Sequence, residues 1–290
     1  MIETAYQYCE SLAKSHYENF PVASRFLPKK IRRPIAVIYT FARLADDMAD
    51  EGDLTQAERL DQLNHYWTAL EDLRSGATPK ELVFIALQDV LKTNPDLPIS
   101  LFFDLLTAFK QDVIKHQYEN FEEILNYCRY SANPIGRLLL YLTDHSSEEN
   151  LKASDEICTA LQLINFLQDL KSDLSQRGRC YLPLDEMREL HITLEDLNNN
   201  QENPNIQTLI NQQLKRAEDL LNQGSILGKR LPGLFGFEIR LIIQGGKTIA
   251  CALEQRKSVY TRPSLRAWQW LKIMGSDLKC LIFKNLRFKI

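Results

Sequence analysis

The sequence has few residues that interrupt helices, and it has no long apolar run. Only 11 glycines and 11 prolines occur among 290 residues, and the apolar residues between them recur at helical spacing instead of alternating. A stretch of about 18 apolar residues, which a membrane-spanning helix needs, is missing. The first twenty residues include three glutamates and lack the apolar core of a signal peptide. We therefore expect an all-α protein in the cytoplasm.

Further absences exclude classes of site and partner. The 6 cysteines are scattered, with no CxxC spacing and no histidine cluster beside them, which argues against zinc and against a disulfide framework. Lys+Arg 35 against Asp+Glu 38 gives a formal net charge of -3, so the basic excess of a nucleic-acid-binding protein is lacking. No glycine-rich turn follows a predicted strand, so no dinucleotide fingerprint is present.

The length of 290 residues and the 44% content of hydrophobic residues favour a single domain spanning 1–290. The polar region 176–205 is expected to be loop with short helical pieces. The expected helices are 31–50, 55–75, 80–93, 98–116, 120–131, 134–144, 150–174, 206–223 and 235–260.

Two acidic clusters stand near the ends of predicted helices, and each places carboxylates at i and i+4. The first is Asp46-Asp47-Met48-Ala49-Asp50 and the second is Asp169-Leu170-Lys171-Ser172-Asp173. Like charges four apart on a helix cost about 0.2–0.5 kcal/mol per pair, and a divalent cation removes that penalty. Asn165, four residues before Asp169, extends the second cluster into a stripe of oxygen ligands. The spacing suggests facing helices that hold metal ions between them.

The chemistry of these ligands indicates which metal they would take. Hard oxygen ligands without His or Cys select Mg²⁺ or Mn²⁺, and Mg²⁺ is usually completed by substrate phosphates and water. A diphosphate would supply the missing ligands. Cationic side chains that could meet a diphosphate are Arg43, Arg129, Arg137, Lys171, Arg177 and Arg179.

Simpler explanations exist for each motif taken alone. A single DxxxD pair more often marks a solvated acidic face, but the apolar neighbours of the second cluster, among them Ile164 and Phe166, favour a site. The segment Tyr127–Gly136 can be explained as a helix broken by Pro134 with tyrosines in the core. Its small residues would also let two helices, or a long flat ligand, approach closely.

Taken together, the motifs resemble those of the squalene/phytoene synthases, the head-to-head isoprenoid synthases of the all-α terpenoid synthase fold. The first acidic cluster follows Tyr39-x-x-x-Arg43, and the second lies in NFLQDLKSD ahead of Arg179-Cys180-Tyr181-Leu182-Pro183. The resemblance covers roughly residues 5–260 and implies a helical bundle with a central active-site cavity.

The resemblance also implies roles for individual residues. Asp46, Asp50, Asn165, Asp169 and Asp173 would bind Mg²⁺, with Mn²⁺ as a substitute, and the four aspartates would be catalytic. Tyr127 and Tyr130 would be further catalytic residues, one of which contacts the diphosphate together with Arg43. Arg262 or Arg266 would also reach the diphosphate. The residues implied to bind a prenyl diphosphate substrate are His16, Asn19, Arg43, Arg129, Asn133, Asn165, Gln168 and Arg179.

Two short segments resemble the branch of bacterial hopanoid pathways, hydroxysqualene synthase. They are 19–24 and 128–136, and the serines that follow the first His in other relatives are replaced here after His16. The branch takes presqualene diphosphate from a sister enzyme, ionises it and adds water, without NADPH. Asn19, Arg129 and Asn133 are candidates for holding that water. Two alternatives stay open: condensation of two prenyl diphosphates to presqualene diphosphate, squalene or phytoene, and a non-catalytic assembly protein, which would be expected to lose metal ligands.

The C-terminal segment 262–290 combines tryptophan, leucine, isoleucine and phenylalanine with lysine and arginine. Basic amphipathic segments of this kind favour anionic bilayer surfaces, so we expect peripheral contact with the inner face of the membrane. A final helix packed on the core, with solvated lysines, would show the same pattern.

Overall fold

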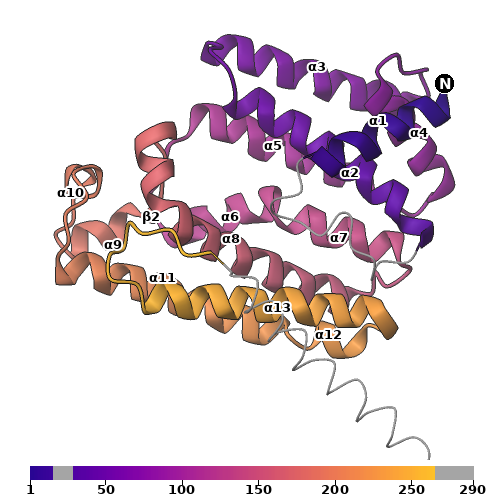
Figure 1. The fold of residues 1–290 in the computed structure, drawn as a ribbon. Helices are drawn as coiled ribbons and strands as arrows, with labels where there is room; N and C mark the ends of the chain where they lie inside the picture. The colour runs from indigo at the N-terminus through magenta and orange to yellow at the C-terminus, as the bar shows by residue number, and fades with distance from the viewer. Residues whose placement is uncertain (16–28, 265–290) are drawn as a thin grey trace, which may run out of the picture. The chain divides into compact units, whose positions relative to one another are not determined.

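The computed structural model describes residues 1–15 and 29–264, and its regular structure is almost entirely helical (Figure 1). The predicted all-α fold is therefore confirmed.

The chain forms two compact units, Met1–His116 with Leu125–Leu151 and Gln117–Ile124 with Lys152–Ile290, and each is described by itself. The helices of the first half are α1 (Ile2–Ser15), α2 (Lys29–Asp50), α3 (Gln56–Ser75), α4 (Leu82–Thr93), α5 (Ser100–Ile114), α6 (Phe121–Ser131) and α7 (Asn133–Leu142). Those of the second half are α8 (Glu148–Arg177), α9 (Leu184–Glu189), α10 (Leu194–Asn198), α11 (Pro204–Gly224), α12 (Leu227–Arg230) and α13 (Gly233–Glu254).

Most predicted helices are confirmed to within a few residues, including the break before Pro134, which falls in the first turn of α7. The prediction for 235–260 was wrong at its end, because α13 stops at Glu254. There the Arg256 side chain turns inward to bind backbone carbonyl groups, and residues 255–264 form no helix. The region 176–205 also contains a short strand that the sequence pattern did not predict, β2 (Cys180–Pro183), which pairs in parallel with β1 (Gln117–Tyr118).

In the first unit, α2 packs against α1, α3, α4, α5 and α7. Phe41 of α2 is fully buried, and its ring centroid lies 5.6 Å from that of Tyr66, 6.0 Å from Phe84 and 5.2 Å from Phe102. Asp46 follows Phe41 by five residues, which turns it about 140° away around the helix. The aromatic cluster therefore fixes the rotation of α2 so that the acidic residues point away from the core of that cluster.

In the second unit, α11 and α13 pack together and small residues let each approach α8. A Cβ added at Gly224 would lie 2.6 Å from the carbonyl oxygen of Ala153, and one added at Gly246 would lie 2.7 Å from Cδ2 of Leu161. Since real Cβ contacts are longer than this, a larger residue at either position would force the helices apart. Among residues 1–15 and 29–264, no helix is long and apolar enough to cross a membrane.

Candidate active site

In the first unit, the first acidic cluster forms the last turn of α2. Arg43, one turn earlier, places its guanidinium nitrogens 2.6 Å from Oδ1 of Asp47 and 3.5 Å from Oδ2 of Asp46. The cation predicted to meet a diphosphate is thus held on the same surface as the carboxylates. Its side chain is 31% exposed, which leaves it accessible to a bound anion.

The end of α2 is closed by a residue that the sequence analysis missed, Arg59 of α3. Its guanidinium donates to the carbonyl oxygens of Met48 (3.1 Å), Glu51 (2.9 Å) and Gly52 (2.7 Å). The last carbonyls of a helix carry partial negative charge, so cations are favoured there and carboxylates are not. Arg59 offsets part of that charge and fixes the turn that carries Asp46 and Asp50.

The environment of Asp46 disfavours its ionised form. Burial is the main cause, followed by the negative charge of Asp50, and together they raise the pKa of Asp46 to about 6. Its side chain is nevertheless 44% exposed. A carboxylate that is accessible to solvent, and whose negative charge is only partly balanced by nearby positive charge, is stabilised by a bound cation.

Next to the acidic turn, the same face of α2 is apolar. Ile35, Ile38, Tyr39 and Ala42 line a cavity of about 150 Å³ that α7 closes with two apolar side chains, Ile135 and Leu139. The spacing from Tyr39 and Ala42 to Asp46 is seven and four residues, which places them on one helix face. Along α2, this face of the first unit therefore changes from apolar side chains to carboxylates toward the C-terminal end of the helix.

The segment around the α6–α7 break places its predicted residues differently. Tyr127 is 4% exposed, and its hydroxyl donates to Oδ2 of Asp112 at 2.7 Å. Asn133 is 7% exposed at the start of α7. Arg129 is exposed, with its guanidinium 5.7 Å from the ring centroid of the half-buried Tyr130. Tyr127 and Asn133 are thus buried in the first unit, while Arg129 lies at its surface.

In the second unit, α8 carries the second acidic cluster near its C-terminal end. Asp173 is one turn from the end of the helix, and 11% of its side chain is exposed. Burial raises the pKa of Asp173 to about 6, although Arg177 and Arg179 act in the opposite direction. Asp169 is half-buried and Asn165 is exposed. The three residues predicted as a stripe of oxygen ligands lie along this one helix, and the most buried of them is near its C-terminal end.

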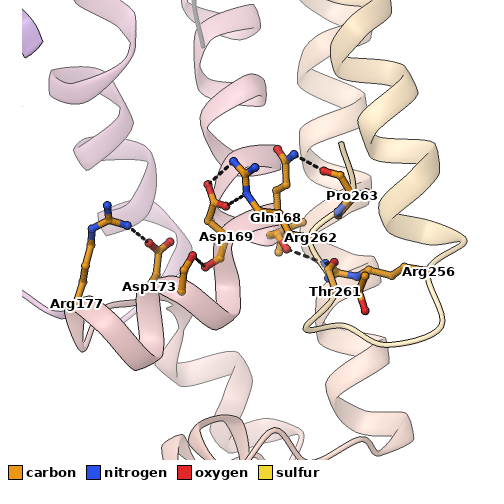
Figure 2. Close-up of polar contacts among 10 residues, drawn as sticks. Gln168, Asp169, Asp173, Arg177, Arg256, Thr261, Arg262 and Pro263 are labelled. Carbon is orange, nitrogen blue, oxygen red and sulfur yellow. Dashed lines mark hydrogen bonds and ion pairs between the residues drawn. The ribbon is translucent and has the colours of Figure 1, made fainter. Parts of the chain in front are cut away.

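Figure 2 shows that arginines occupy both carboxylates of this stripe. The guanidinium of Arg262 makes a two-point contact with Asp169, from Nε to Oδ1 and from Nη2 to Oδ2, the latter at 3.4 Å. Arg177 Nη1 donates to Oδ1 of Asp173 at 3.1 Å. Both contacts indicate that the stripe attracts positive charge in this structure.

The segment after α13 is fastened to the same turn of α8 (Figure 2). Arg256 Nη1 donates to the carbonyl oxygens of Leu167 at 2.9 Å and of Thr261 at 3.2 Å. The side-chain amide of Gln168 donates to the carbonyl oxygen of Pro263. These contacts hold Arg262 beside Asp169, and neither Arg256 nor the use of Gln168 as a tether was predicted from the sequence.

Residues in β2 and just before it contact α8 near the C-terminal end of that helix. The ring of Tyr181 stacks on Phe166 of α8, with centroids 3.9 Å apart and planes at 5°. Arg179, just before β2, is 7% exposed, and its backbone N–H donates to the carbonyl oxygen of Asp173 at 2.9 Å. The predicted basic residue is therefore buried beside the acidic stripe.

Two predicted residues, His16 and Asn19, lie outside the described residues, as does the C-terminal segment from residue 265. Within residues 1–15 and 29–264, no three His, Cys, Asp or Glu side chains gather into a group that could hold a metal ion. The two carboxylate sets, one at the C-terminal end of α2 and one near that of α8, still fit a hard divalent cation in their donor chemistry. Both offer carboxylate oxygens near a helix terminus that favours positive charge, and each contains a carboxyl with a raised pKa.

Comparison with known proteins gives a consistent result. The family model described as squalene/phytoene synthase matches residues 13–269. Hydroxysqualene synthase of Sinorhizobium fredii is 34% identical over 252 residues, which is 86% of this chain and 83% of that protein. The hydroxysqualene synthase of Zymomonas mobilis is 40% identical over 185 residues, 62% of this chain and 59% of that protein.

Solved structures show the same relationship. Squalene synthase HpnC from Alicyclobacillus acidocaldarius has a TM-score of 0.81 and 33% identity, with 90% of this chain and 97% of that chain covered. A dehydrosqualene synthase in complex with ligand has a TM-score of 0.80 and 25% identity, with 97% of each chain covered. These likenesses confirm the predicted isoprenoid synthase fold. The chain belongs to the squalene/phytoene synthase family, whose members are enzymes that act on prenyl diphosphates.

Proposed function

We propose that this protein is a hydroxysqualene synthase of squalene and hopanoid biosynthesis. Presqualene diphosphate would lose its diphosphate, which leaves with the electron pair of the C–O bond, and the resulting carbocation would rearrange. A water oxygen would then bond to the cationic carbon and release a proton, giving hydroxysqualene and diphosphate. The observation that carries the proposal is the similarity to hydroxysqualene synthases over 86% of the chain, in a protein that keeps both carboxylate sets.

The residues proposed to hold Mg²⁺, or Mn²⁺ in its place, are Asp46, Asp50, Asn165, Asp169 and Asp173. When bound, the metal would supply positive charge that stabilises the departing diphosphate. The carboxylates would determine where the positive charge of the metal lies, because both sets are near helix ends that favour cations. We expect no requirement for NADPH, since the overall change from presqualene diphosphate and water involves no reduction.

The basic side chains are proposed to bind the diphosphate. Arg43 already lies on the acidic turn of α2, and Arg179 is buried beside Asp173. Arg177 and Arg262 contact the aspartates of α8 directly, and we propose that each guanidinium exchanges its carboxylate partner for a phosphate oxygen, which is also a negatively charged acceptor. Fixed cations of this kind stabilise negative charge that develops on a leaving group.

The apolar face of α2 is proposed to receive part of the hydrocarbon chain. A carbocation requires surroundings with few nucleophiles, and the cavity between α2 and α7 is lined by Ile35, Ile38, Tyr39, Ala42, Ile135 and Leu139. Because this lining continues directly into Asp46 on the same helix face, it suits a molecule with a hydrocarbon tail and a diphosphate head. Asn133, buried at the start of α7, is the described residue we propose for holding the attacking water.

The first prediction concerns the substrate. Full-length protein with Mg²⁺ and presqualene diphosphate, without NADPH, should form hydroxysqualene, detected by mass spectrometry of the lipid extract. Farnesyl diphosphate supplied alone should remain unconverted. Omitting Mg²⁺ and adding EDTA should abolish product formation, because the carboxylate sets then lack their cation.

The likeness to a dehydrosqualene synthase structure favours a second candidate, condensation of two prenyl diphosphates. Consumption of farnesyl diphosphate in the same assay would establish it and refute the first proposal. Turnover of neither substrate would favour a non-catalytic assembly role. If the first proposal holds, presqualene diphosphate must come from a separate condensing enzyme, and we propose such a sister synthase as a functional partner.

We further propose one isoprenoid synthase domain with a C-terminal segment, 262–290, that contacts the cytoplasmic face of the membrane. The segment's mixture of aromatic, aliphatic and basic residues supports this, because such segments bind anionic bilayers. Because the proposed product is insoluble in water, contact with the membrane would let it pass into the bilayer.

The second prediction tests this contact by flotation with liposomes. Full-length protein should float with vesicles containing phosphatidylglycerol, and protein truncated after Ser264 should stay in the dense fraction. Vesicles of phosphatidylcholine alone and high salt should each reduce flotation, since part of the attraction is electrostatic. Equal flotation of the two proteins would refute the role of the segment.

A further inference from the structure

The first unit buries a carboxyl group that the proposed function does not use. Asp112, in the last turn of α5, is 6% exposed and accepts the hydroxyl proton of Tyr127 at 2.7 Å. A buried carboxylate is costly to desolvate unless it is hydrogen-bonded, so a structural role alone is a poor reason to keep one.

Asp112 also lies near the first carboxylate set. Its negative charge is one of the influences that raise the pKa of Asp46, after burial and Asp50. All of these groups belong to the first unit: Asp46 and Asp50 on α2, Asp112 on α5 and Tyr127 on α6. The Asp112–Tyr127 pair is therefore part of the electrostatic surroundings of the acidic turn.

The direction of the hydrogen bond determines what Tyr127 can do. A hydroxyl has one hydrogen, and Tyr127 gives it to Asp112. While that bond is present, the phenol oxygen can accept a hydrogen bond or face a positive charge, but it cannot donate to a diphosphate. A carboxylate acceptor also polarises the hydroxyl and increases the negative charge on its oxygen.

We propose that Asp112 is a positioning residue that holds the Tyr127 hydroxyl with its electron-rich oxygen available to the positively charged intermediate. The proposal rests on the proposed function for the identity of that intermediate. It makes Tyr127 a residue that stabilises positive charge, and it makes the arginines, not Tyr127, the donors to the diphosphate. Asp112 itself touches neither the substrate nor the metal.

The third prediction uses three variants of this pair. Asp112→Leu and Tyr127→Phe should each lower kcat about 100-fold, as loss of a preorganised polar group does, with KM for presqualene diphosphate changed less than about three-fold. The double variant should be no slower than either single variant, because both remove the same interaction. Asp112→Asn keeps an oxygen acceptor of the same size and should retain intermediate activity.

The chain offers a matched control in Tyr6, whose hydroxyl donates to Oδ2 of Asp89 at 2.8 Å. This pair joins α1 to α4, which carry none of the candidate site residues. Tyr6→Phe and Asp89→Leu should lower the melting temperature by amounts similar to the Asp112 and Tyr127 variants while kcat stays unchanged. If Asp112→Leu does not fold, Asp112→Asn and Tyr127→Phe still test the pair.

The proposal is overturned if Asp112→Leu slows turnover no more than Asp89→Leu, if the Asp112→Leu and Tyr127→Phe effects multiply, or if KM rises while kcat is kept. Wild-type protein that converts farnesyl diphosphate instead would refute the proposed product. The same variant ratios, measured on that substrate, would still decide whether Asp112 acts through Tyr127. A wild type that converts neither diphosphate would refute both proposals.

Discussion

Replacing Asp173 by asparagine is expected to lower kcat about 100- to 1000-fold while making the metal-free protein more stable at pH 7. The side chain is 11% exposed, and burial raises the pKa of Asp173 to about 6 from an ordinary 3.8. That difference means that ionised Asp173 destabilises the folded state by up to roughly 3 kcal/mol at neutral pH. Asparagine removes the charge and keeps an oxygen that can accept from Arg177. Turnover of presqualene diphosphate and thermal melting in EDTA measure the two effects.

A matched control is available at the surface. Asp219 pairs with Lys215 across one helical turn at 2.7 Å, as Asp173 does with Arg177, but its side chain is 51% exposed. Asp219→Asn should leave both kcat and the melting temperature nearly unchanged, because an exposed pair contributes little. An Asp173→Asn protein that is active, or less stable than wild type in EDTA, would show that the carboxylate serves the fold and not the metal.

The local part of this site could be predicted from the sequence. Asp46 and Asp50, and likewise Asp169 and Asp173, are brought together by helical periodicity alone, and the Arg43–Asp47 contact follows from a separation of four residues. The end of α2 after Asp50 was predicted from the Gly52 that follows it. Such inferences need only the geometry of one helix.

The supporting contacts could not be predicted, because they join segments far apart in the chain. Arg256 reaches Leu167 across 89 residues and Arg262 reaches Asp169 across 93. The strand β1 has two residues, too few for an alternating pattern to be seen. Tyr127 was predicted to belong to the site, but its hydrogen-bond partner Asp112 was not. In the sequence, a single aspartate in a predicted helix cannot be distinguished from a solvent-exposed one.

The second large effect expected is a loss of stability as the pH of the metal-free protein rises from 5 to 7. Asp46 and Asp173 both have a pKa of about 6 in the folded protein and ordinary values near 3.8 when unfolded. Between these values the folded state binds more protons than the unfolded state, so the free energy of unfolding falls as pH rises through about 6. From pH 5 to pH 7 the decrease should be roughly 1–2 kcal/mol, mostly from Asp173, because about half of each shift takes effect below pH 5 and solvent screens the 44% exposed Asp46. This corresponds to a melting temperature lower by about 2–5 °C.

The double variant Asp46→Asn/Asp173→Asn separates this effect from other titrations. Burial raises the pKa of Asp104 as well, so some fall in stability with pH should remain in the variant. Glu58 and Asp196 have lowered pKa values because of hydrogen bonds at helix N-termini, and they titrate below this pH range. Melting curves of both proteins in EDTA between pH 5 and 7 make the comparison. A wild-type curve parallel to that of the variant would contradict the assigned carboxyl groups.

Adding Mg²⁺ or Mn²⁺ should reverse the trend. A cation that binds the folded state stabilises it in proportion to RT ln(1 + [L]/Kd), and protons compete for the same carboxylates at pH 5. The metal-induced rise in melting temperature should therefore be larger at pH 7 than at pH 5 and nearly absent in the double variant. The carboxylates that weaken the metal-free fold at neutral pH are then the ones that let a cation restore it, which links the instability of these helix ends to metal binding.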